Sequence, residues 1–385
     1  MNIHEYQAKA LFRKYGIPVP EGYPAFDLEE AEAVLDEHFP DGRAVLKAQV
    51  HSGGRGKAGG ILLGDSKEDA LEKAGKLFGM KLVTRQTGPE GKTVRKIYIE
   101  RPSVIDEELY LSLLVDTGCA RHVFIACREG GTSIEELAER EPEKIIRVCI
   151  DPEKGFTQED GKKIAAALGQ DEGKIIQAAQ HMYEMFTSED CTLIEINPLA
   201  VNRGELTALD AKVILDSDAM FRHKENLALQ DESEEDPLEL EAARYGMNYV
   251  SLSGDIGCIC NGAGLGMSTM DAISHYGGRP ANFMDTGGTV TVEKAAAAYE
   301  IVAGCGKVRG IIVNIFGGIA RTDLIAEGLV QGMRNIRKPV VVRIDGNSAE
   351  KAREILTASG LPVVMADNCS DAVRKMMDLL KGEEQ

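Results

Sequence analysis

The chain has 385 residues, of which 44 are Lys or Arg and 62 are Asp or Glu, so its formal net charge is −18. This charge argues against nonspecific binding to nucleic acid or to an anionic membrane surface, and it requires any phosphate-binding groove to be a local basic exception. The length predicts two or three domains, because one hydrophobic core rarely serves so many residues.

The eight cysteines are scattered without a CxxC pair, and no apolar run approaches the length of a membrane span. The N-terminal residues lack the apolar segment of a signal peptide. We therefore expect a cytoplasmic protein with reduced, mostly buried thiols and no zinc site.

The first half of the chain predicts helices and strands in an irregular order, which indicates an α+β lobe rather than a wound sheet. Helices are expected over residues 4–15, 28–39, 66–78, 157–168 and 172–186. Strands are expected over residues 44–50, 94–100, 109–116, 122–127 and 145–150.

A glycine-rich loop over residues 51–60 follows the second of these helices and its strand. It holds five glycines, Arg55 and Lys57. Glycines let backbone amides approach a phosphate chain closely, the two cations supply charge, and Lys47 on the preceding strand could reach the same phosphates. The spacing is not that of a Walker A loop, and a flexible surface hairpin is the alternative.

The segment over residues 101–108 begins with Arg-Pro and joins two expected strands, as a hinge between two lobes does. Backbone groups at such a hinge can bind an adenine edge, and a carboxylate such as Glu100 or Glu108 can hold ribose hydroxyls. The alternative is that both carboxylates are solvated surface groups.

A hairpin is predicted over residues 192–201 and 204–212. It would bring Glu195, Asn197 and Asp210 near one another, and a carboxylate with an amide oxygen suits Mg²⁺ on a phosphate chain better than zinc. Pro198 lacks a backbone donor, so we expect the first strand to be an edge strand or to bend there. The alternative is a plain hairpin whose polar residues face solvent.

Residues 231–241 carry seven acids and one proline, which indicates an exposed linker or a polar helix start, with a domain boundary near Met247. Beyond it, strands and helices alternate, which predicts a doubly wound parallel sheet. The strands are expected over residues 256–260, 282–284, 310–315, 340–344 and 362–365. The helices are expected over residues 265–275, 292–303, 321–333, 348–359 and 370–380.

Two loops follow strands of this second half, over residues 261–266 and 314–320, and each leads into a helix whose free amides favour an anion. The first loop departs from a dinucleotide fingerprint because Met267 stands where the third glycine belongs. Tight strand-to-helix turns are the alternative for both loops.

Five motifs resemble, in order and spacing, the β subunits of succinyl-CoA synthetase, the succinate–CoA ligase family, from Met1 to about Leu380. They are His4-Glu-Tyr-Gln-Ala-Lys9, His51-Ser-Gly-Gly-Arg-Gly-Lys-Ala-Gly-Gly60, Leu193-Ile-Glu-Ile-Asn-Pro-Leu199, Cys258-Ile-Cys-Asn-Gly-Ala-Gly-Leu265 and Val313-Asn-Ile-Phe-Gly-Gly-Ile319. The resemblance implies a two-lobed ATP-grasp domain over residues 1–240 and a flavodoxin-like CoA-ligase domain over residues 247–385.

The resemblance also implies roles for individual residues. The nucleotide phosphates would be bound by Lys47, Gly54, Arg55 and Gly56, and the base and ribose by Glu100, Ser103 and Glu108. Mg²⁺ would be held by Asn197 and Asp210, with Glu195 beside them as the catalytic residue. The acid substrate, succinate, would lie near Asn261, Gly318, Ile319 and Ala320.

A partner follows from the same resemblance: an α subunit that supplies a phosphohistidine and the CoA site, in an αβ or α2β2 complex. Succinyl-CoA and phosphate would give an acyl phosphate, the α histidine would take the phosphoryl group, and ADP bound by this chain would receive it, a step of the citric acid cycle. The in-line transfer needs Mg²⁺ and cations to spread the developing charge.

The histidines of this chain argue for that partner. Only His51 of the seven lies in the predicted phosphate-facing loop, where Arg55 and Lys57 would depress its basicity and bind phosphate themselves, so it is interpreted as a loop residue. The chain also lacks the Gly-His-Ala-Gly type of loop of the α subunits.

Some positions depart from the family pattern or leave specificity open. Thr286 and Thr289 add bulk to a segment that is usually richer in glycine, Gly317 favours succinate over the malate of malate–CoA ligase β subunits, and Pro20 resembles ADP-type rather than GTP-type subunits. One alternative function is that of a nucleotide-binding module without catalytic activity. Another is that of a nicotinamide dehydrogenase, which Met267 argues against because it replaces the third glycine of the dinucleotide fingerprint.

Overall fold

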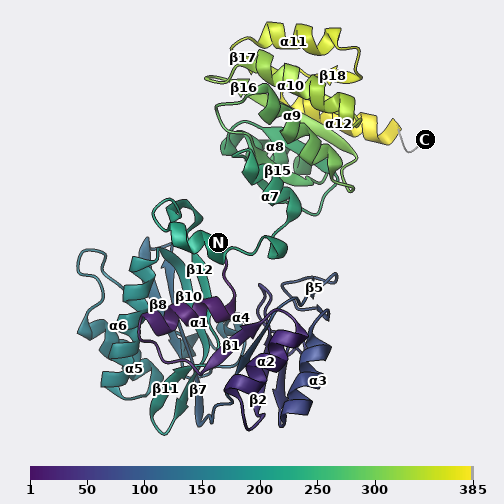
Figure 1. Cartoon of the computed structure of the whole chain (residues 1–385). Helices are drawn as coiled ribbons and strands as arrows, with labels where there is room; N and C mark the ends of the chain where they lie inside the picture. Colours follow the sequence, from purple (N-terminus) through teal and green to yellow (C-terminus); the bar gives the residue numbers. More distant parts are fainter. Residues whose placement is uncertain (383–385) are drawn as a thin grey trace. The chain divides into compact units, whose positions relative to one another are not determined.

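The computed structural model describes residues 1–382, and the chain forms two compact units that divide between Glu234 and Glu235. The division lies before the boundary near Met247 that the composition suggests. Each unit has its own sheets and hydrophobic core (Figure 1).

The first sheet of the N-terminal unit is antiparallel, with strand order β1-β6-β2-β3. Its strands are β1 (Gly22–Ala25), β2 (Ala44–Ala48), β3 (Ile61–Gly64) and β6 (Ile97–Glu100). Helices α2 (Leu28–His38) and α3 (Lys67–Leu77) cover one face, and the core between them contains Leu35, Leu46 and Leu77. A small ribbon of β4 (Lys81–Leu82) and β5 (Lys92–Thr93) completes this lobe.

The second sheet of this unit has the order β11-β10-β7-β8-β9, and β12 also pairs with β10. Its strands are β7 (Glu107–Asp116), β8 (Arg121–Cys127), β9 (Ile146–Cys149), β10 (Cys191–Asn202), β11 (Glu205–Ala208) and β12 (Lys212–Leu215). Its core takes buried side chains from helices α1 (Glu5–Lys14), α5 (Gln158–Leu168) and α6 (Glu172–Ser188). The short α4 (Ile134–Arg140) follows β8. The irregular order of elements thus gives the predicted α+β unit of two lobes.

The hairpin strand β10 is not an edge strand, and that part of the prediction is wrong. It pairs with β7 on one side and with β11 and β12 on the other. The bend is confirmed, because the register with β7 shifts between Ile196 and Leu199, around Pro198. A proline is tolerated inside the sheet where the ladder is interrupted.

The acidic segment after residue 230 begins against the N-terminal unit rather than as an exposed linker. The Asp231 side chain is 12% exposed and accepts from His4 and Lys96, and the Glu234 side chain is 7% exposed and accepts from Lys92. The expected helix start is confirmed in α7 (Pro237–Arg244), which Asp236 caps.

The second unit contains one six-stranded sheet with the order β13-β15-β14-β16-β17-β18. The strands are β13 (Asn248–Ser251), β14 (Ile256–Cys260), β15 (Asn282–Asp285), β16 (Gly310–Gly317), β17 (Val340–Gly346) and β18 (Val363–Met365). The five predicted strands are parallel, and their order is that of flavodoxin-like sheets. The sequence analysis missed β13, which adds an antiparallel edge strand.

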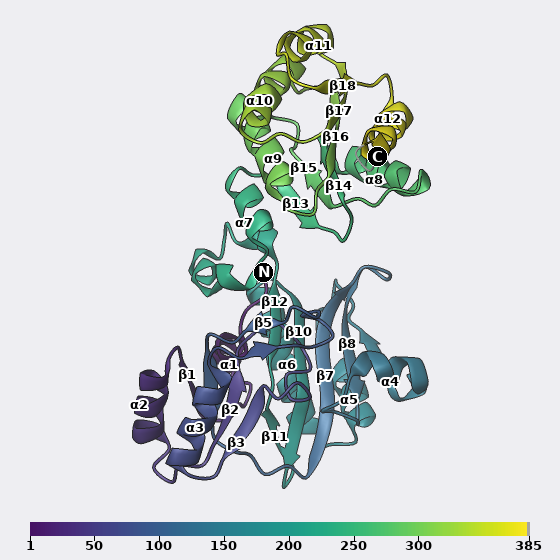
Figure 2. The same cartoon turned by 90° about the vertical axis from the view of Figure 1, so that its right-hand side faces the viewer.

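Helices cover both faces of this sheet, as the doubly wound prediction requires (Figure 2). One core lies under α9 (Val292–Gly304), α10 (Thr322–Asn335) and α11 (Ala349–Ala358). The other lies under α8 (Ala263–His275) and α12 (Cys369–Gly382). None of the helices among residues 1–382 is long and apolar enough to cross a membrane.

Candidate functional site

A buried cluster of charges lies in the N-terminal unit and contains Lys47, Arg55, Glu100 and Asp210 of the predicted site. Lys47 Nζ lies 2.5 Å from Glu100 Oε1, and Arg55 donates to Asp210 Oδ1 at 2.8 Å. Four elements supply these side chains: β2, the glycine-rich loop that follows it, the end of β6 and the turn between β11 and β12.

Two further residues of the cluster, Glu5 and Lys9, come from α1 and were not predicted. Glu5 accepts from Lys47 at 3.0 Å and from Arg55 at 2.8 Å, and Lys9 contacts Glu5 at 2.9 Å and Glu100 at 2.5 Å. The only signal available was their spacing of four residues, which puts both on one helix face but is equally typical of a solvated pair.

In this cluster, neighbouring opposite charges outweigh the effect of burial on the pKa values of Glu5 and Lys47. Burial alone would raise the pKa of Glu5, but Lys47, Lys9 and Arg55 outweigh it and hold this pKa well below its usual range. Burial would lower the pKa of Lys47, but Glu5, Glu100 and Asp210 outweigh it and raise this pKa. Lys47 and Arg55 therefore stay charged, but the carboxylates that they contact balance their charge, so the cluster is not by itself the basic groove that the net charge led us to expect.

The glycine-rich loop turns Arg55 into the cluster, so the Arg55 side chain is only 7% exposed, whereas Lys57 remains exposed. Gly54 has a φ of 73°, and a Cβ there would meet no atom within 4 Å. The loop also joins β2 and β3 as an antiparallel hairpin. The same segment can therefore be both a β-hairpin and a phosphate-binding loop.

His51, at the start of this loop, has its pKa lowered from 6.5 to about 4, first by burial and then by His4, whose ring centroid lies 4.5 Å away. The predicted direction is confirmed, but the stated cause is not, because burial, His4 and Lys92 lower the pKa rather than Arg55 and Lys57. An imidazole this weakly basic matches its interpretation as a loop residue.

The hairpin residues do lie in one region. Lys212 is the register partner of Glu195 on the neighbouring strand, and its Nζ lies 3.9 Å from Glu195 Oε2. Burial, reinforced by the charges of Asp210 and Glu135, raises the pKa of Glu195 in spite of Lys212. Asp210 keeps a side chain that is 38% exposed, so its second oxygen is available to a ligand.

Asn197 and Glu108 meet at the loop that precedes α4. The Asn197 amide accepts from Gly131 N at 2.7 Å and donates to Thr132 O at 2.9 Å. A Cβ at Gly131 would lie 2.2 Å from Glu108 Oε2, so this carboxylate lies directly against the glycine backbone. Ser103 lies in the exposed loop between β6 and β7. Among the described residues, Glu100 contacts the lysines rather than Ser103 or Glu108.

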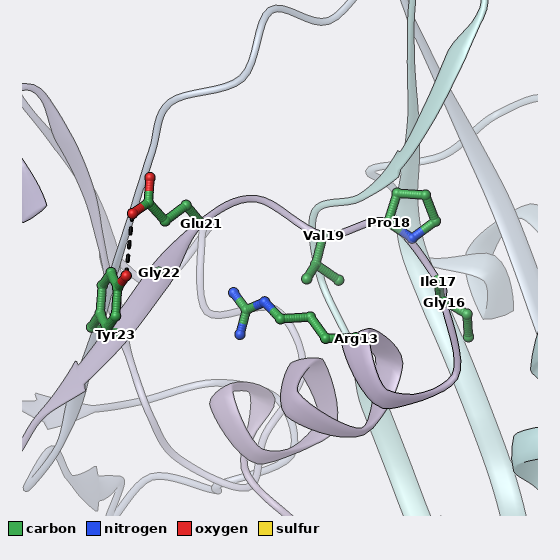
Figure 3. A pocket seen from close by; sticks show the side chains of 8 residues that line it. All are labelled: Arg13, Gly16, Ile17, Pro18, Val19, Glu21, Gly22 and Tyr23. Atoms are coloured by element: carbon green, nitrogen blue, oxygen red, sulfur yellow. Dashed lines mark hydrogen bonds between the residues drawn. The ribbon is translucent and has the colours of Figure 1, made fainter.

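A pocket of about 620 Å³ opens where the chain passes from α1 to β1, and none of its lining residues belongs to the charged cluster. Figure 3 shows Arg13 extending between Val19 and Glu21, with Tyr23 on β1 at one side. Arg13 donates to Pro20 O and to the Tyr98 hydroxyl, and this fixes the wall of the pocket near Pro20.

The donors near the cluster suit a hard cation. Asn197, Asp210 and Glu195 offer oxygen atoms, as Mg²⁺ prefers. No group of three or more His, Cys, Asp or Glu side chains arranged to hold a metal occurs among residues 1–382. A cation held by one carboxylate, one amide and the phosphates of a ligand is consistent with both observations, because Mg²⁺ is usually bound through few protein ligands.

In the second unit, the two predicted loops lie at the carboxyl ends of neighbouring strands β14 and β16. Asn261 joins them, because its side chain donates to Phe316 O at 2.8 Å and accepts from Phe316 N at 2.9 Å. The chain order reverses between these two strands, which is where wound sheets bind ligands.

The rest of this edge combines open backbone with apolar side chains. Gly318 has no atom within 4 Å of a Cβ, Ile319 is 87% exposed and Ala320 is buried. Asp285 at the end of β15 accepts from Gly262 N at 2.6 Å and Gly287 N at 2.7 Å. Thr286 is buried and donates to Cys260 O, so its departure from the family pattern is accommodated inside the unit.

Comparison with known proteins identifies both units. The model of the ATP-grasp domain matches residues 2–201, and the model named CoA-ligase matches residues 259–377. A solved structure of ATP citrate lyase from Methanothrix soehngenii, in complex with citrate and coenzyme A, has a TM-score of 0.76 at 17% identity and covers 98% of this chain and 99% of that one. At this identity, the likeness shows a shared fold.

The similarity in sequence is greater to two curated bacterial proteins. The succinate–CoA ligase [ADP-forming] subunit beta of Parvibaculum lavamentivorans is 48% identical over 99% of both chains. The protein of the same name from Bacillus licheniformis is 46% identical, over 99% of this chain and 100% of that one. The chain therefore belongs to the family of the β subunits of ADP-forming succinate–CoA ligase.

Proposed function

We propose that this chain binds Mg-nucleotide and succinate, and that it transfers a phosphoryl group between ADP and a phosphohistidine on an α-type partner subunit. The observation that carries the proposal is the convergence of Lys47 and Arg55 with Asp210, which lies 155 residues after Arg55 in the sequence, in one buried cluster of an ATP-grasp unit. The names of relatives that match the whole chain support the same activity.

The phosphates would bind where Lys47 and Arg55 now meet carboxylates. A phosphate chain offers more negative charge than Glu5 or Glu100, and its oxygens accept from an ammonium and a guanidinium at the same distances. The backbone of Gly54 and Gly56 would add amide donors. These groups would spread the charge that develops on the transferred phosphoryl group.

Asn197 and Asp210 would hold Mg²⁺, which supplies charge neutralisation between the phosphates during transfer. Asn197 would give up its bond to Gly131, and Asp210 would use the oxygen that faces away from Arg55. Glu195, whose pKa is raised, would be the catalytic residue of this chain. It would orient hydrogen-bond donors beside Asn197 and Asp210.

Ser103 and Glu108 are proposed for the base and ribose, because both side chains are exposed near the hinge between the lobes. Glu100 would reach the base and ribose only by leaving Lys9 and Lys47, so its first role would be to hold Lys47 at the phosphates. Pro20, whose carbonyl oxygen accepts from Arg13, resembles the ADP-type subunits, so we expect ADP rather than GDP.

In the second unit, Asn261, Gly318, Ile319 and Ala320 would line the acid site together with the partner, in an αβ or α2β2 complex. Open backbone at Gly318 suits a carboxylate, and the exposed Ile319 suits a partner surface. We expect the complex to act in the cytoplasm.

The proposal is tested by isolating the 385-residue chain without a partner and incubating it with [γ-³²P]ATP and Mg²⁺. We expect no acid-labile label on this chain and no succinyl-CoA, and we expect both after an α-type subunit is added. Stable label on the isolated chain would overturn the two-subunit proposal.

Equilibrium dialysis of the isolated chain separates the alternatives. MgADP should be retained and NAD should not. Retention of MgADP without turnover in the presence of the partner, CoA and succinate would favour a silent binding module. Replacing succinate by malate in the same assay measures the acid specificity.

A further inference from the structure

Glu5 lies at the centre of the charged cluster and contacts all three of its cations. One oxygen lies between Lys9 at 2.9 Å and Lys47 at 3.0 Å, and the other lies 2.8 Å from Arg55. By contrast, Glu100 contacts the two lysines, and Asp210 contacts Arg55. Glu5 is thus the group through which the two phosphate-binding cations are linked.

Lys9 cannot itself serve a ligand from solvent, because its side chain is completely buried. It lies one helical turn after Glu5 on α1 and donates to Glu100 and to Leu209 O, which also accepts from Lys47. Its ammonium contacts both glutamates and so compensates their charge.

The cluster contains three cations, Lys9, Lys47 and Arg55, and three carboxylates, Glu5, Glu100 and Asp210, so its formal charge is zero. An incoming phosphate chain competes with these carboxylates for the cations. The charge of α1 therefore sets both the direction in which Lys47 and Arg55 point and the strength with which they attract an anion.

We propose that Glu5 and Lys9 are positioning residues of the nucleotide site: Glu5 holds Lys47 and Arg55 in place and moderates their attraction for phosphate, and Lys9 holds Glu5. The inference rests on the proposed function of Lys47 and Arg55 as phosphate-binding residues. It adds the N-terminal helix, which supplies no predicted ligand, to the groups that determine nucleotide affinity.

The test uses two variants that each remove one charge and so change the charge of the cluster in opposite directions. Glu5→Gln leaves the cluster with one extra positive charge, so the Kd for MgADP should fall about tenfold. The same variant should lower kcat about tenfold, because Lys47 and Arg55 lose their shared acceptor and its fixed geometry. Lys9→Gln leaves one extra negative charge, and the Kd should rise about tenfold.

Titration calorimetry of the full chain with MgADP gives the Kd, and assays of the complex with its partner give KM and kcat. A purely structural role would lower the melting temperature in both variants without moving Kd in opposite directions. Equal or unchanged Kd values in the two variants would overturn the proposal. If Glu5→Gln does not fold, an unchanged Kd in Lys9→Gln overturns it alone.

Glu189 provides a matched control in the same unit. It is also a buried carboxylate, accepts from Lys14 at 2.6 Å and from Asn226 at 2.9 Å, and lies outside the cluster. Glu189→Gln should lower the melting temperature and leave Kd, KM and kcat for MgADP unchanged. Failure of the unmodified chain to bind MgADP at all would instead contradict the proposed function, which keeps the two outcomes distinct.

Discussion

The two candidate sites are built in opposite ways. The cluster around Lys47 joins charged side chains from distant segments, such as Arg55 and Asp210, which are 155 residues apart, and it buries most of them. The strand-end site of the second unit is uncharged at its centre, where Asn261 bonds the backbone of Phe316, and it leaves Phe316 and Ile319 exposed.

This difference indicates different ligands. A buried set of balanced charges suits a small, highly charged molecule, because the charges of the molecule can replace a carboxylate as the partner of a buried cation. An open edge with exposed apolar side chains and free backbone matches a surface that a protein partner completes. Changes in the first region should therefore affect nucleotide kinetics, and changes in the second should affect assembly.

The largest effect is expected from Asp210→Asn. The substitution keeps the size of the side chain but removes the carboxylate proposed for Mg²⁺, so turnover with Mg-nucleotide should fall on the order of 100-fold or more. Steady-state assays of the complex measure it, and an unchanged circular dichroism spectrum confirms the fold. Near-normal kinetics would contradict the metal assignment.

A somewhat smaller loss is expected from Lys47→Met. It removes one cation from the phosphate position, so the KM for MgADP should rise and kcat should fall, with kcat/KM reduced about 30-fold. Lys76→Met is the control, because Lys76 is exposed on α3 and pairs with Glu72 outside the cluster. A change confined to the KM for succinate would show that the nucleotide site lies elsewhere.

Ile319→Asp tests whether the strand-end site of the second unit is a docking surface. The side chain is 87% exposed, so the melting temperature of the chain should stay unchanged. A charge placed in an apolar contact should weaken binding of the α-type partner about tenfold or more, and MgADP binding should be unaffected. Analytical ultracentrifugation measures assembly. A partner affinity equal to that of the unmodified chain would exclude this edge as the docking surface.

The smallest effect concerns pH. His51 has a folded-state pKa of about 4 against 6.5 in the unfolded chain, so the unfolded state binds more protons between these values. Stability is therefore lost as the pH falls from about 6.5 towards 4. His51→Gln should flatten this part of the curve of melting temperature against pH. An equally steep curve in the variant would mean that another group causes the loss, such as His4, whose pKa burial also lowers from 6.5.

Several features were determined by the sequence alone. In the second unit, runs such as residues 310–315 alternate with helical segments, and this local pattern is sufficient to predict a parallel sheet of five strands, whereas the flavodoxin-like strand order was implied by the family resemblance. The strand β13 was missed because it is short and half exposed, and it is a strand only because it pairs with β15. The loops at Asn261 and Gly318 follow from the topology, because the ends of parallel strands meet at one edge.

Only the tertiary structure decided the composition of the charged cluster. Glu5 and Lys9 read as an ordinary pair on an amphipathic helix, and no spacing relates them to Lys47, Arg55 or Glu100. The sequence likewise predicts Asp231 and Glu234 to be exposed acids, and only the structure shows that they pair with Lys96 and Lys92. A helix or strand has a period that a sequence displays, whereas an ion pair between distant segments has none. Its partners are selected by burial, because a charge removed from water must meet an opposite charge.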